Sequence, residues 1–456
     1  MRVSFALVVW GEDYVKDFLD ASLPTLLAEG NLADTVGLAG SRFHLLTTPA
    51  DRDLLYASAL FERLKSILPV DFIDISQIRG SDKYNIASRC QLEAIRLSED
   101  FDALVLLYPD VIWSRGSIRF AVNALESGAL AVFSPAPAIQ SERTLAELND
   151  LKNPCEPAGA RAISITPDQV TDLVLRNFHP MWDAFDWNGD CFTDSPACLR
   201  WNVGNQGWLI RCFHLHPVIL RVQRDNPRYF SGFNVSLDGE YVARLFDGTS
   251  HLCFATDSRK FAIASLRAVD SPPLPRHGRR SEIASVSRWA EAHTLLLHRA
   301  FAKVAFRWQR GPLDDAAWHT ATTSSANVIS EVIDRLNTPD SIIKLEDLAA
   351  YRARMQRKHM LTARRSTIVV PPSRAGQSRM ELATLLVARV TKGAIWRAAS
   401  TIRNSRFANW LAYSPTATRL WKRTKSMIQP QSTFDDARSN RDIIRSIVRG
   451  RLDRND

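Results

Sequence analysis

The stretch DALVLLYPDVIWSRG, residues 102–116, decides the fold that we expect for this chain. Its apolar run, 103–108, stops abruptly at Pro109-Asp110, and a short apolar run that ends in a turn signal is typical of a buried strand. Asp110 then follows the carboxyl end of this strand, where open α/β sheets bind their ligands. Two interpretations stay open: Asp110 caps the following turn, or it holds a metal ion or a sugar hydroxyl.

Strand-like and helical segments alternate around this stretch. Apolar runs typical of strands cover 3–10, 42–48, 70–75 and 130–133, and apolar residues recur at helical spacing in 15–27, 51–67, 84–98 and 117–126. This alternation predicts the α/β class, with a doubly wound and mostly parallel sheet. Further along, 199–203 and 208–213 flank a Gly-Asn-Gln-Gly turn and predict a hairpin.

The sequence lacks three familiar motifs for phosphate binding and for nucleophilic catalysis. There is no GxGxxG after the first strand and no GxxxxGK[ST] anywhere, so neither common glycine-rich phosphate loop is present. There is also no GxSxG elbow, which argues against a Ser-His-Asp hydrolase. A bound nucleotide would therefore have its phosphates met by side chains or by a metal ion.

Composition indicates a soluble globular protein. The chain has 456 residues, of which 45% are apolar, and no apolar run reaches the 18 residues of a transmembrane helix candidate. The N-terminal apolar stretch runs into Trp-Gly-Glu-Asp and is interpreted as a first strand instead of a signal peptide. Six cysteines form no CxxC pair, which fits a reducing cytosol and argues against a structural zinc site.

The net charge of +9 belongs to the C-terminal part. Residues 351–456 contain 23 Lys and Arg against 6 Asp and Glu, a net charge of +17, and residues 1–350 carry −8. Such asymmetry predicts an anionic partner for the tail. The segment 380–411 reads as basic amphipathic helices, which either lie on an anionic membrane or pack as a helical bundle on the catalytic domain or between copies of the chain. No nucleic-acid-binding motif is present, so no nucleic acid is expected.

Composition changes suggest the domain boundaries. A proline- and arginine-rich stretch separates a catalytic domain, 1–270, from a helical region, and the linker is placed at 271–281. The helical region covers 282–370, with helical patterns at 284–307 and 327–355. After the break at 370–372, the basic amphipathic helical tail covers 371–456.

Several side chains are candidates for binding. His214 and His216 alternate on an expected strand and would point the same way, so they suit a divalent metal ion; the alternative is one core histidine and one that faces a pocket. Lys83 and Arg89, near the start of the helix before the Asp110 strand, suit a diphosphate or lie on a solvated face.

Two aromatic residues and three carboxylates complete the candidates. Trp10 and Tyr14 follow the first strand and either stack on a base or pack in the core. Asp238 and Glu240, in a polar turn after the His-x-His segment, are candidates for a general base, and Asp257 at a later strand end is a rival.

Together, the segments VVWGEDY, LPTLLAEGNL, ALVLLYPDVIWS, FHLHP and ATDS resemble those of GT-A-type nucleotide-sugar glycosyltransferases, of the bacterial kind that builds polysaccharides or lipid-linked glycans. The resemblance covers residues 1–265. It implies a nucleotide-sugar over the first half of the sheet and a strand-end DxD motif that holds Mn²⁺ or Mg²⁺ on the diphosphate. Here that motif reads Tyr108-Pro109-Asp110. Asp110 therefore needs help from His214, His216 or Asp257, or Lys83 and Arg89 replace the metal.

The resemblance implies transfer of a sugar from a nucleotide-sugar to a glycan or lipid-linked acceptor in surface polysaccharide synthesis. We expect a cytoplasmic protein that is peripheral at the inner face of the cell membrane through its basic tail. The alternative is a non-catalytic, degenerate transferase that acts as a membrane-associated binding or scaffold protein.

Overall fold

The computed structural model describes residues 1–32, 39–80, 82–151, 159–233, 236–271, 276–277, 280–311, 315–336 and 368–369. All of them belong to one compact unit, Met1–Arg374. The predicted amphipathic tail, 371–456, and the part of the predicted helix beyond 336 lie outside the described residues. None of the described helices is both long enough and apolar enough to cross a membrane.

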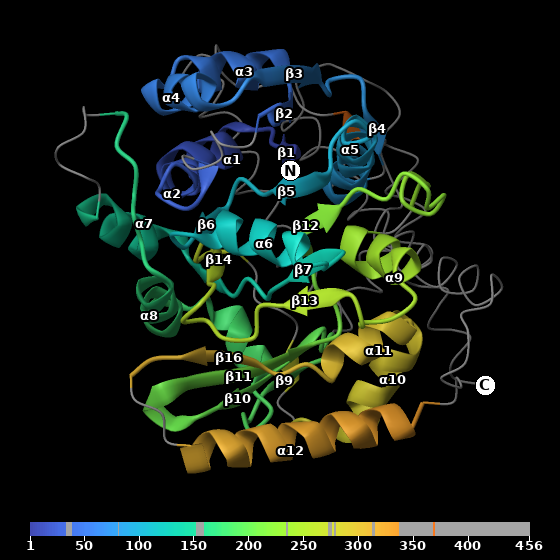
Figure 1. Ribbon diagram of the computed structural model, residues 1–456. Coiled ribbons are helices and arrows are strands. Elements are labelled where there is room, and N and C mark those ends of the chain that lie inside the picture. The colour runs from blue at the N-terminus through green and yellow to red at the C-terminus, as the bar shows by residue number, and fades with distance from the viewer. Residues whose placement is uncertain are drawn as a thin grey trace, which may run out of the picture. The chain divides into compact units, whose positions relative to one another are not determined.

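A seven-stranded sheet forms the centre of the unit (Figure 1). Its strands in spatial order are β13 (Leu252–Phe254), β7 (Ala131–Phe133), β12 (Pro217–Arg221), β5 (Ala103–Leu107), β1 (Val3–Val8), β2 (Arg42–Thr47) and β3 (Val70–Asp74). β12 is antiparallel to both of its neighbours, and the other pairs are parallel. Numbered along the chain, the order is 3-2-1-4-6-5-7, whereas dinucleotide-binding sheets follow 3-2-1-4-5-6.

Both faces of this sheet are buried, as the near-continuous apolar runs of its strands predict. Along β5, Leu104 and Leu106 join one hydrophobic cluster, and Ala103, Val105 and Leu107 join another. Helix α5 (Lys83–Leu97) packs in the first cluster. The second cluster contains residues of α1 (Glu12–Asp17), the π-helical turn η1 (Phe18–Ser22), α2 (Leu23–Leu26), α4 (Ala59–Ile67) and α6 (Ser117–Glu126). The predicted α/β class and doubly wound, mostly parallel sheet are therefore confirmed.

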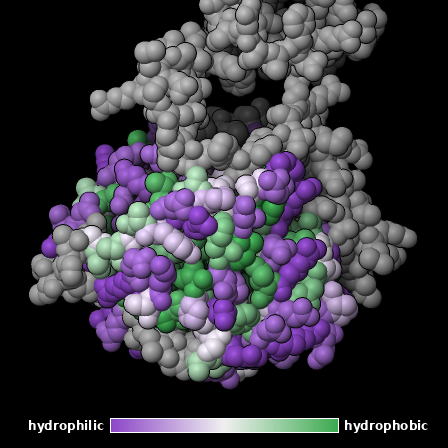
Figure 2. All heavy atoms as spheres, turned by 90° about the horizontal axis from the view of Figure 1, so that it is seen from above, coloured by the Kyte–Doolittle hydropathy of each residue, from purple (hydrophilic) through white to green (hydrophobic). Residues whose placement is uncertain are grey.

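Shorter sheets and helices surround the central sheet. The small sheets are β10 (Cys198–Asn202), β11 (Gly207–Cys212) and β16 (Phe306–Gln309); β6 (Val111–Trp113), β14 (Ile263–Arg267) and β8 (Ala138–Gln140); β15 (Arg276–His277) with β9 (Phe192–Thr193); and β17 (Ile368–Val369) with β4 (Arg79–Gly80). The remaining helices are α3 (Pro49–Tyr56), α7 (Ser141–Asp150), α8 (Pro167–Asn177), η3 (Pro180–Phe185), η4 (Gly204–Gln206), η5 (Leu237–Tyr241), α9 (Val242–Leu245), α10 (Ile283–His293), α11 (Leu296–Ala302) and α12 (Asp315–Asp334). Seen from above in Figure 2, polar and apolar residues are interspersed on the described surface.

Most predicted elements are found, with two informative exceptions. The predicted helix at 51–67 is two helices, α3 and α4, which break at Ala57-Ser58. The predicted helix at 284–307 is wrong at its end, because 306–309 form strand β16 beside β11. This strand gains its hydrogen-bond partners from a hairpin nearly 100 residues earlier, a contact that local periodicity does not reveal. The domain boundaries stay a prediction.

Candidate active site

The topology of the sheet selects one crevice. From β1 the chain continues to β2 and β3 on one side, and β5 then returns to the other side of β1. The β1–β5 boundary is therefore a topological switch point, and ligands of open α/β sheets bind beyond the carboxyl ends of such strands. Trp10-Gly11 leaves β1 there and Tyr108-Pro109-Asp110 leaves β5 there, so the structure places this predicted anchor at the crevice.

Asp110 is held by strand β14. The Ser265 hydroxyl donates to Asp110 Oδ2 at 3.1 Å, and the Leu266 amide donates to the Asp110 carbonyl at 2.6 Å. Burial raises the pKa of Asp110, against the opposing effects of the Ser265 hydrogen bond and of Arg267. A nearby cation stabilises the ionised form of a carboxyl group whose pKa is raised. Asp110 is therefore suited to contact a metal ion or a basic side chain.

A second carboxylate, Asp17 at the end of α1, is coupled to Asp110. Burial raises the pKa of Asp17 to about 6, and the negative charges of Asp110, Asp13 and Asp20 add to this rise. The crevice thus concentrates negative charge that is only partly compensated. Asp17 was not among the predicted site residues.

On the other side of Asp110, antiparallel pairing brings a histidine to Tyr108. β12 runs against β5, so the residue before β12 lies beside the residue after β5. His216 Nδ1 lies 3.0 Å from the Tyr108 hydroxyl, and His216 Nε2 lies 3.5 Å from Asp238 Oδ2. Gln91 Nε2 donates to the same hydroxyl at 3.4 Å. The side chain of His216 is 48% exposed, so it is accessible to a ligand.

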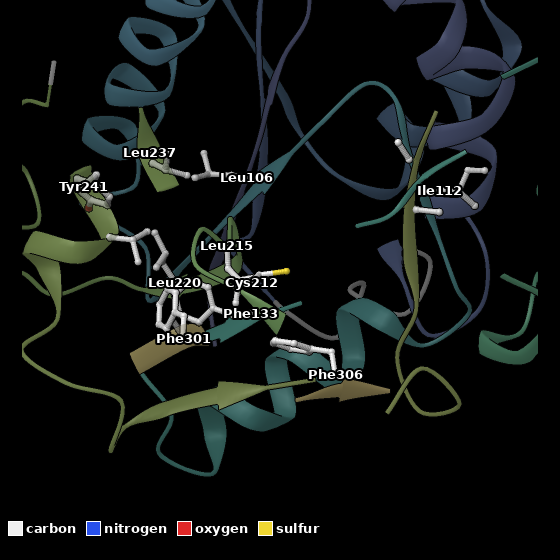
Figure 3. Close-up of a cluster of buried hydrophobic side chains, with 14 of the residues drawn as sticks. Leu106, Ile112, Phe133, Cys212, Leu215, Leu220, Leu237, Tyr241, Phe301 and Phe306 are labelled. Carbon is white, nitrogen blue, oxygen red and sulfur yellow. The ribbon is translucent and has the colours of Figure 1, made fainter. Parts of the chain in front are cut away.

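Buried neighbours fix this Tyr-His-Asp chain in place. Leu215 precedes His216 and Leu237 precedes Asp238, and both leucines belong to one hydrophobic cluster (Figure 3). Their burial anchors the connection before β12, from which His216 projects, and the start of η5, from which Asp238 projects. Because the sequence places an apolar residue directly beside each polar one, the backbone is held while the functional groups stay near the surface.

Histidines keep Asp238 ionised. Burial alone would raise its pKa, but His216 and His214, a hydrogen bond from Ser236, and His298 together lower the pKa of Asp238 to about 2. An ionised Asp238 favours a proton on His216 Nε2, which leaves Nδ1 to accept the Tyr108 hydroxyl hydrogen.

His298, in α11, supports Asp238 from the core. Its Nε2 lies 2.8 Å from the Asp238 carbonyl, and its Nδ1 accepts from the Leu295 amide at 3.0 Å. Burial and the nearby His214 lower the pKa of His298 to about 3, so its ring is neutral and Nε2 donates. His298 is a positioning residue that the sequence did not single out.

The prediction that His214 and His216 share a strand face is wrong. Strand β11 ends at Cys212, and both histidines lie in the connection to β12. His214 Nε2 lies 3.0 Å from the His293 carbonyl, and its ring contacts those of His298 and Trp289. The two side chains therefore have separate partners, although both charges act on Asp238.

The structure does not support Glu240 or Asp257 as the base. The Glu240 side chain is fully buried and lies 3.7 Å from Arg244, so an acceptor hydroxyl has no access to it. Asp257 follows β13, three strands or roughly 14 Å from β5 across the sheet. It accepts hydrogen bonds from Arg259 and Gln309, and the Arg259 bonds lower its pKa against burial.

The predicted donor-binding residues divide into two groups. Tyr14 is 41% exposed and Lys83 Nζ lies 5.9 Å from the centre of its ring, so these two residues meet as a pair beside the crevice. Trp10 is half-buried and packs against the hydrophobic core, which is the alternative interpretation given above. Arg89 is exposed on α5, about 9 Å along the helix axis from Lys83.

Within the described part of the chain, no three side chains of His, Cys, Asp or Glu come together as a metal-binding group. The predicted set of Asp110, His214 and His216 is therefore not a complete metal site. Mg²⁺ is commonly held by one or two carboxylates together with substrate phosphates. Asp110, which is partly exposed, fits that shared arrangement, whereas a metal site made by the described side chains alone does not fit.

Comparisons with known proteins include two distant structural matches. No protein-family model and no curated protein matches the sequence. Mouse xyloside xylosyltransferase 1, in its apo form, shares 12% identity at a TM-score of 0.23; the match covers 35% of this chain and 63%, less than two thirds, of the other. The mannosyltransferase PcManGT from Pyrobaculum calidifontis, in complex with GDP-Man and Mn²⁺, shares 12% identity at a TM-score of 0.30, over 79% of this chain and 87% of that one.

The structure itself shows a largely parallel seven-stranded sheet with one antiparallel strand, β12. At these identities and TM-scores the two neighbours carry no argument about the family, donor, metal or acceptor of this chain. The antiparallel direction of β12 matters for the candidate site. It returns His216 to the edge where Asp110 leaves β5.

Proposed function

We propose that the protein is a glycosyltransferase that moves a sugar from a nucleotide-sugar to a glycan or lipid-linked acceptor. One observation carries the proposal: Asp110 and the Tyr108–His216–Asp238 chain meet beside the β1–β5 switch point of a GT-A-like sheet. Glycosyl transfer needs a cationic site for the leaving nucleoside diphosphate and a group that takes the acceptor's proton. Both kinds of group lie at this edge.

The donor would lie over the β1–β5 crevice. Tyr14 presents an exposed ring for stacking, and the ammonium group of Lys83 beside it is placed to meet a phosphate. Arg267, whose charge already acts on Asp110, is a further cation for the diphosphate. Asp110 would hold a divalent ion jointly with the diphosphate, and that ion would supply positive charge for the leaving group.

The acceptor would meet His216. In this arrangement Asp238 orients the imidazole, since its carboxylate stays ionised and lies 3.5 Å from Nε2. An acceptor hydroxyl that replaces the Tyr108 hydroxyl at Nδ1 would pass its proton to the ring. Asp238 has too low a pKa to be an efficient base itself, because a general base works best with a pKa near the operating pH. We therefore assign the base to His216 and the orienting role to Asp238.

A donor screen tests this proposal. Full-length protein is heated with a panel of nucleotide-sugars, with and without Mn²⁺, and one donor should raise the Tm; a ligand at about 100 times its Kd stabilises by about 2.7 kcal/mol. Asp110→Asn should remove both the Mn²⁺-dependent shift and the turnover. Asp190→Asn, which changes a carboxylate that is 85% exposed and paired with Arg280, is the matched control and should behave like wild type.

The results also separate the proposal from its alternative. Donor stabilisation without turnover of any acceptor would favour a degenerate transferase that acts as a binding or scaffold protein. No stabilisation by any nucleotide or nucleotide-sugar would rule out the donor site altogether.

We further propose that the acceptor belongs to surface polysaccharide synthesis and that the tail holds the enzyme at the inner face of the cell membrane. Support comes from the sequence, where residues 351–456 carry a net charge of +17. The full chain should sediment with vesicles that contain anionic lipid at low salt and be released by high salt. A chain that ends at Arg374, the boundary of the compact unit, should stay in solution. Equal sedimentation of both chains would contradict the anchor.

A further inference from the structure

Two cysteines face each other across the β10–β11 hairpin. Cys198 begins β10 and Cys212 ends β11, and the two residues are direct partners in the antiparallel register. Their sulfur atoms lie 2.7 Å apart. Among the cysteines that the structure describes, the others are Cys90, Cys191 and Cys253, and no contact joins any of these to a second sulfur.

The hydrogen-bond ladder shows which kind of pair this is. The Phe213 amide donates to the Ala197 carbonyl at 2.8 Å, so the neighbouring pair, 197 and 213, is a hydrogen-bonded one. Pairs alternate along an antiparallel ladder, which makes Cys198 and Cys212 a non-hydrogen-bonded pair with Cα atoms about 4.5 Å apart. Disulfides span Cα separations of roughly 4.4–6.8 Å, so this backbone accommodates one without rearrangement.

We propose that Cys198 and Cys212 form an oxidisable thiol pair that small-molecule disulfides convert into a cross-strand disulfide. The pair is a modification site in the β10–β11–β16 sheet. The inference stands on the hairpin geometry and is independent of the proposed glycosyltransferase activity.

The two thiols differ in access, which sets the order of the reaction. Cys198 is partly exposed, whereas Cys212 is fully buried among the side chains of the cluster that includes Phe133 and Leu215 (Figure 3). Burial and the adjacent Cys198 sulfur raise the pKa of Cys212 well above its ordinary value. The external disulfide therefore meets Cys198 first, and Cys212 acts as the resolving thiol.

The exchange balances with glutathione disulfide as the oxidant. The Cys198 thiolate attacks one glutathione sulfur, the S–S bond of glutathione disulfide breaks, and one glutathione thiolate leaves. Cys212 then loses its proton to solvent and attacks the Cys198 sulfur, which releases the second glutathione. The protein loses two electrons to form one S–S bond, and glutathione disulfide is reduced to two thiols.

The position of the pair links it to the site described above. Cys212 is the last residue of β11, two residues before His214 and four before His216. A bond between Cys198 and Cys212 would fasten β10 to the point where β11 turns toward His216. Because a cross-link restricts the unfolded chain, the oxidised protein should also have a higher Tm.

The test uses the full-length protein and glutathione disulfide itself. The protein is incubated natively with the reagent, quenched in acid and alkylated under denaturing conditions, and its peptides are mapped by mass spectrometry. We expect the peptides that contain Cys198 and Cys212 to be joined, with two thiols fewer than in the reduced protein, and dithiothreitol should restore both.

Matched variants give distinct products. Cys212→Ser should stop at a glutathione adduct on Cys198, and Cys198→Ser should leave Cys212 reduced. Cys191→Ser, which removes an exposed thiol away from the pair, should still form the cross-link. Wild-type protein that keeps both thiols, or that forms only stable glutathione adducts, would overturn the proposal. The wild-type peptide map decides this even if a variant fails to fold.

Discussion

Asp110 and Asp238 lie at the same edge of the central sheet, but their surroundings shift the two carboxyl pKa values in opposite directions. Around Asp110, burial outweighs the hydrogen bond from Ser265 and raises the pKa, and at Asp17 burial and the negative charge of Asp110 raise the pKa to about 6. Around Asp238, the neighbouring histidines and the hydrogen bond from Ser236 outweigh burial, and the pKa falls to about 2.

The difference separates two roles within one site. Carboxyl groups whose environments push their pKa values apart commonly take different parts in a reaction. On the Asp110 side, negative charge that is only partly compensated can bind a cation, which suits the metal ion that accompanies the donor diphosphate. The Asp238 side has a fixed negative charge already matched to His216, which suits orientation of a base. The predictions below test this division.

Loss of turnover is the largest expected effect. His216→Gln and Asp238→Asn should each lower kcat by about 10²–10⁴, the usual contribution of a general acid-base group. Because the two residues act as one unit, the double variant should be no slower than the slower single variant. Initial rates with the donor identified by the thermal screen measure this. Losses that multiply in the double variant would show that the two residues act separately.

Stability should respond differently on the two sides. The lowered pKa of Asp238 corresponds to about 2 kcal/mol in favour of its ionised folded form, so Asp238→Asn should lower the free energy of unfolding at pH 7 by about that amount. Asp110→Asn should leave it unchanged or raise it, because it removes a buried charge. Urea unfolding of both variants beside wild type checks the order. A larger loss in the free energy of unfolding for Asp110→Asn than for Asp238→Asn would contradict this prediction.

The pH dependence should have opposite signs on the two sides. The raised pKa of Asp17 means that its ionised form destabilises the folded state above pH 6 and that this penalty fades between about pH 6 and pH 4. Asp17→Asn should therefore be more stable than wild type at pH 7 and equal to it at pH 4. The Asp238 contribution is present above about pH 4 and is lost between pH 4 and pH 2. Thermal unfolding of wild type and each variant across pH 2–8 separates the two windows.

The smallest expected effect is that of the Tyr108 hydroxyl. Tyr108→Phe removes the hydrogen bond to His216 Nδ1 and should cost about 1 kcal/mol in the free energy of unfolding, with the ring still in place. Since an acceptor hydroxyl replaces Tyr108 in our proposal, turnover should change by less than in His216→Gln. A loss of turnover equal to that of His216→Gln would instead give Tyr108 a direct part in the chemistry.

Local sequence determined much of the framework. The apolar run before Pro109-Asp110 identified β5 and placed Asp110 at its carboxyl end, because a buried strand and a turn each follow from short-range residue preferences. Short-range preferences also determine the start of α8, where the side chains of Thr166 and Gln169 each bond the other's backbone amide in a capping box.

Only the tertiary structure decided the composition of the site. His216 reaches Tyr108 because β12 runs antiparallel to β5, and Asp238 lies near His216 where Leu237 and Leu215 are buried in one hydrophobic cluster. The partners of Asp110, namely Ser265 and Arg267, come from a strand about 155 residues later. Such contacts depend on strand order and register, which sequence spacing alone does not encode. For the same reason, sequence spacing alone does not reveal the Cys198–Cys212 pair, because the two residues become neighbours only when the hairpin forms.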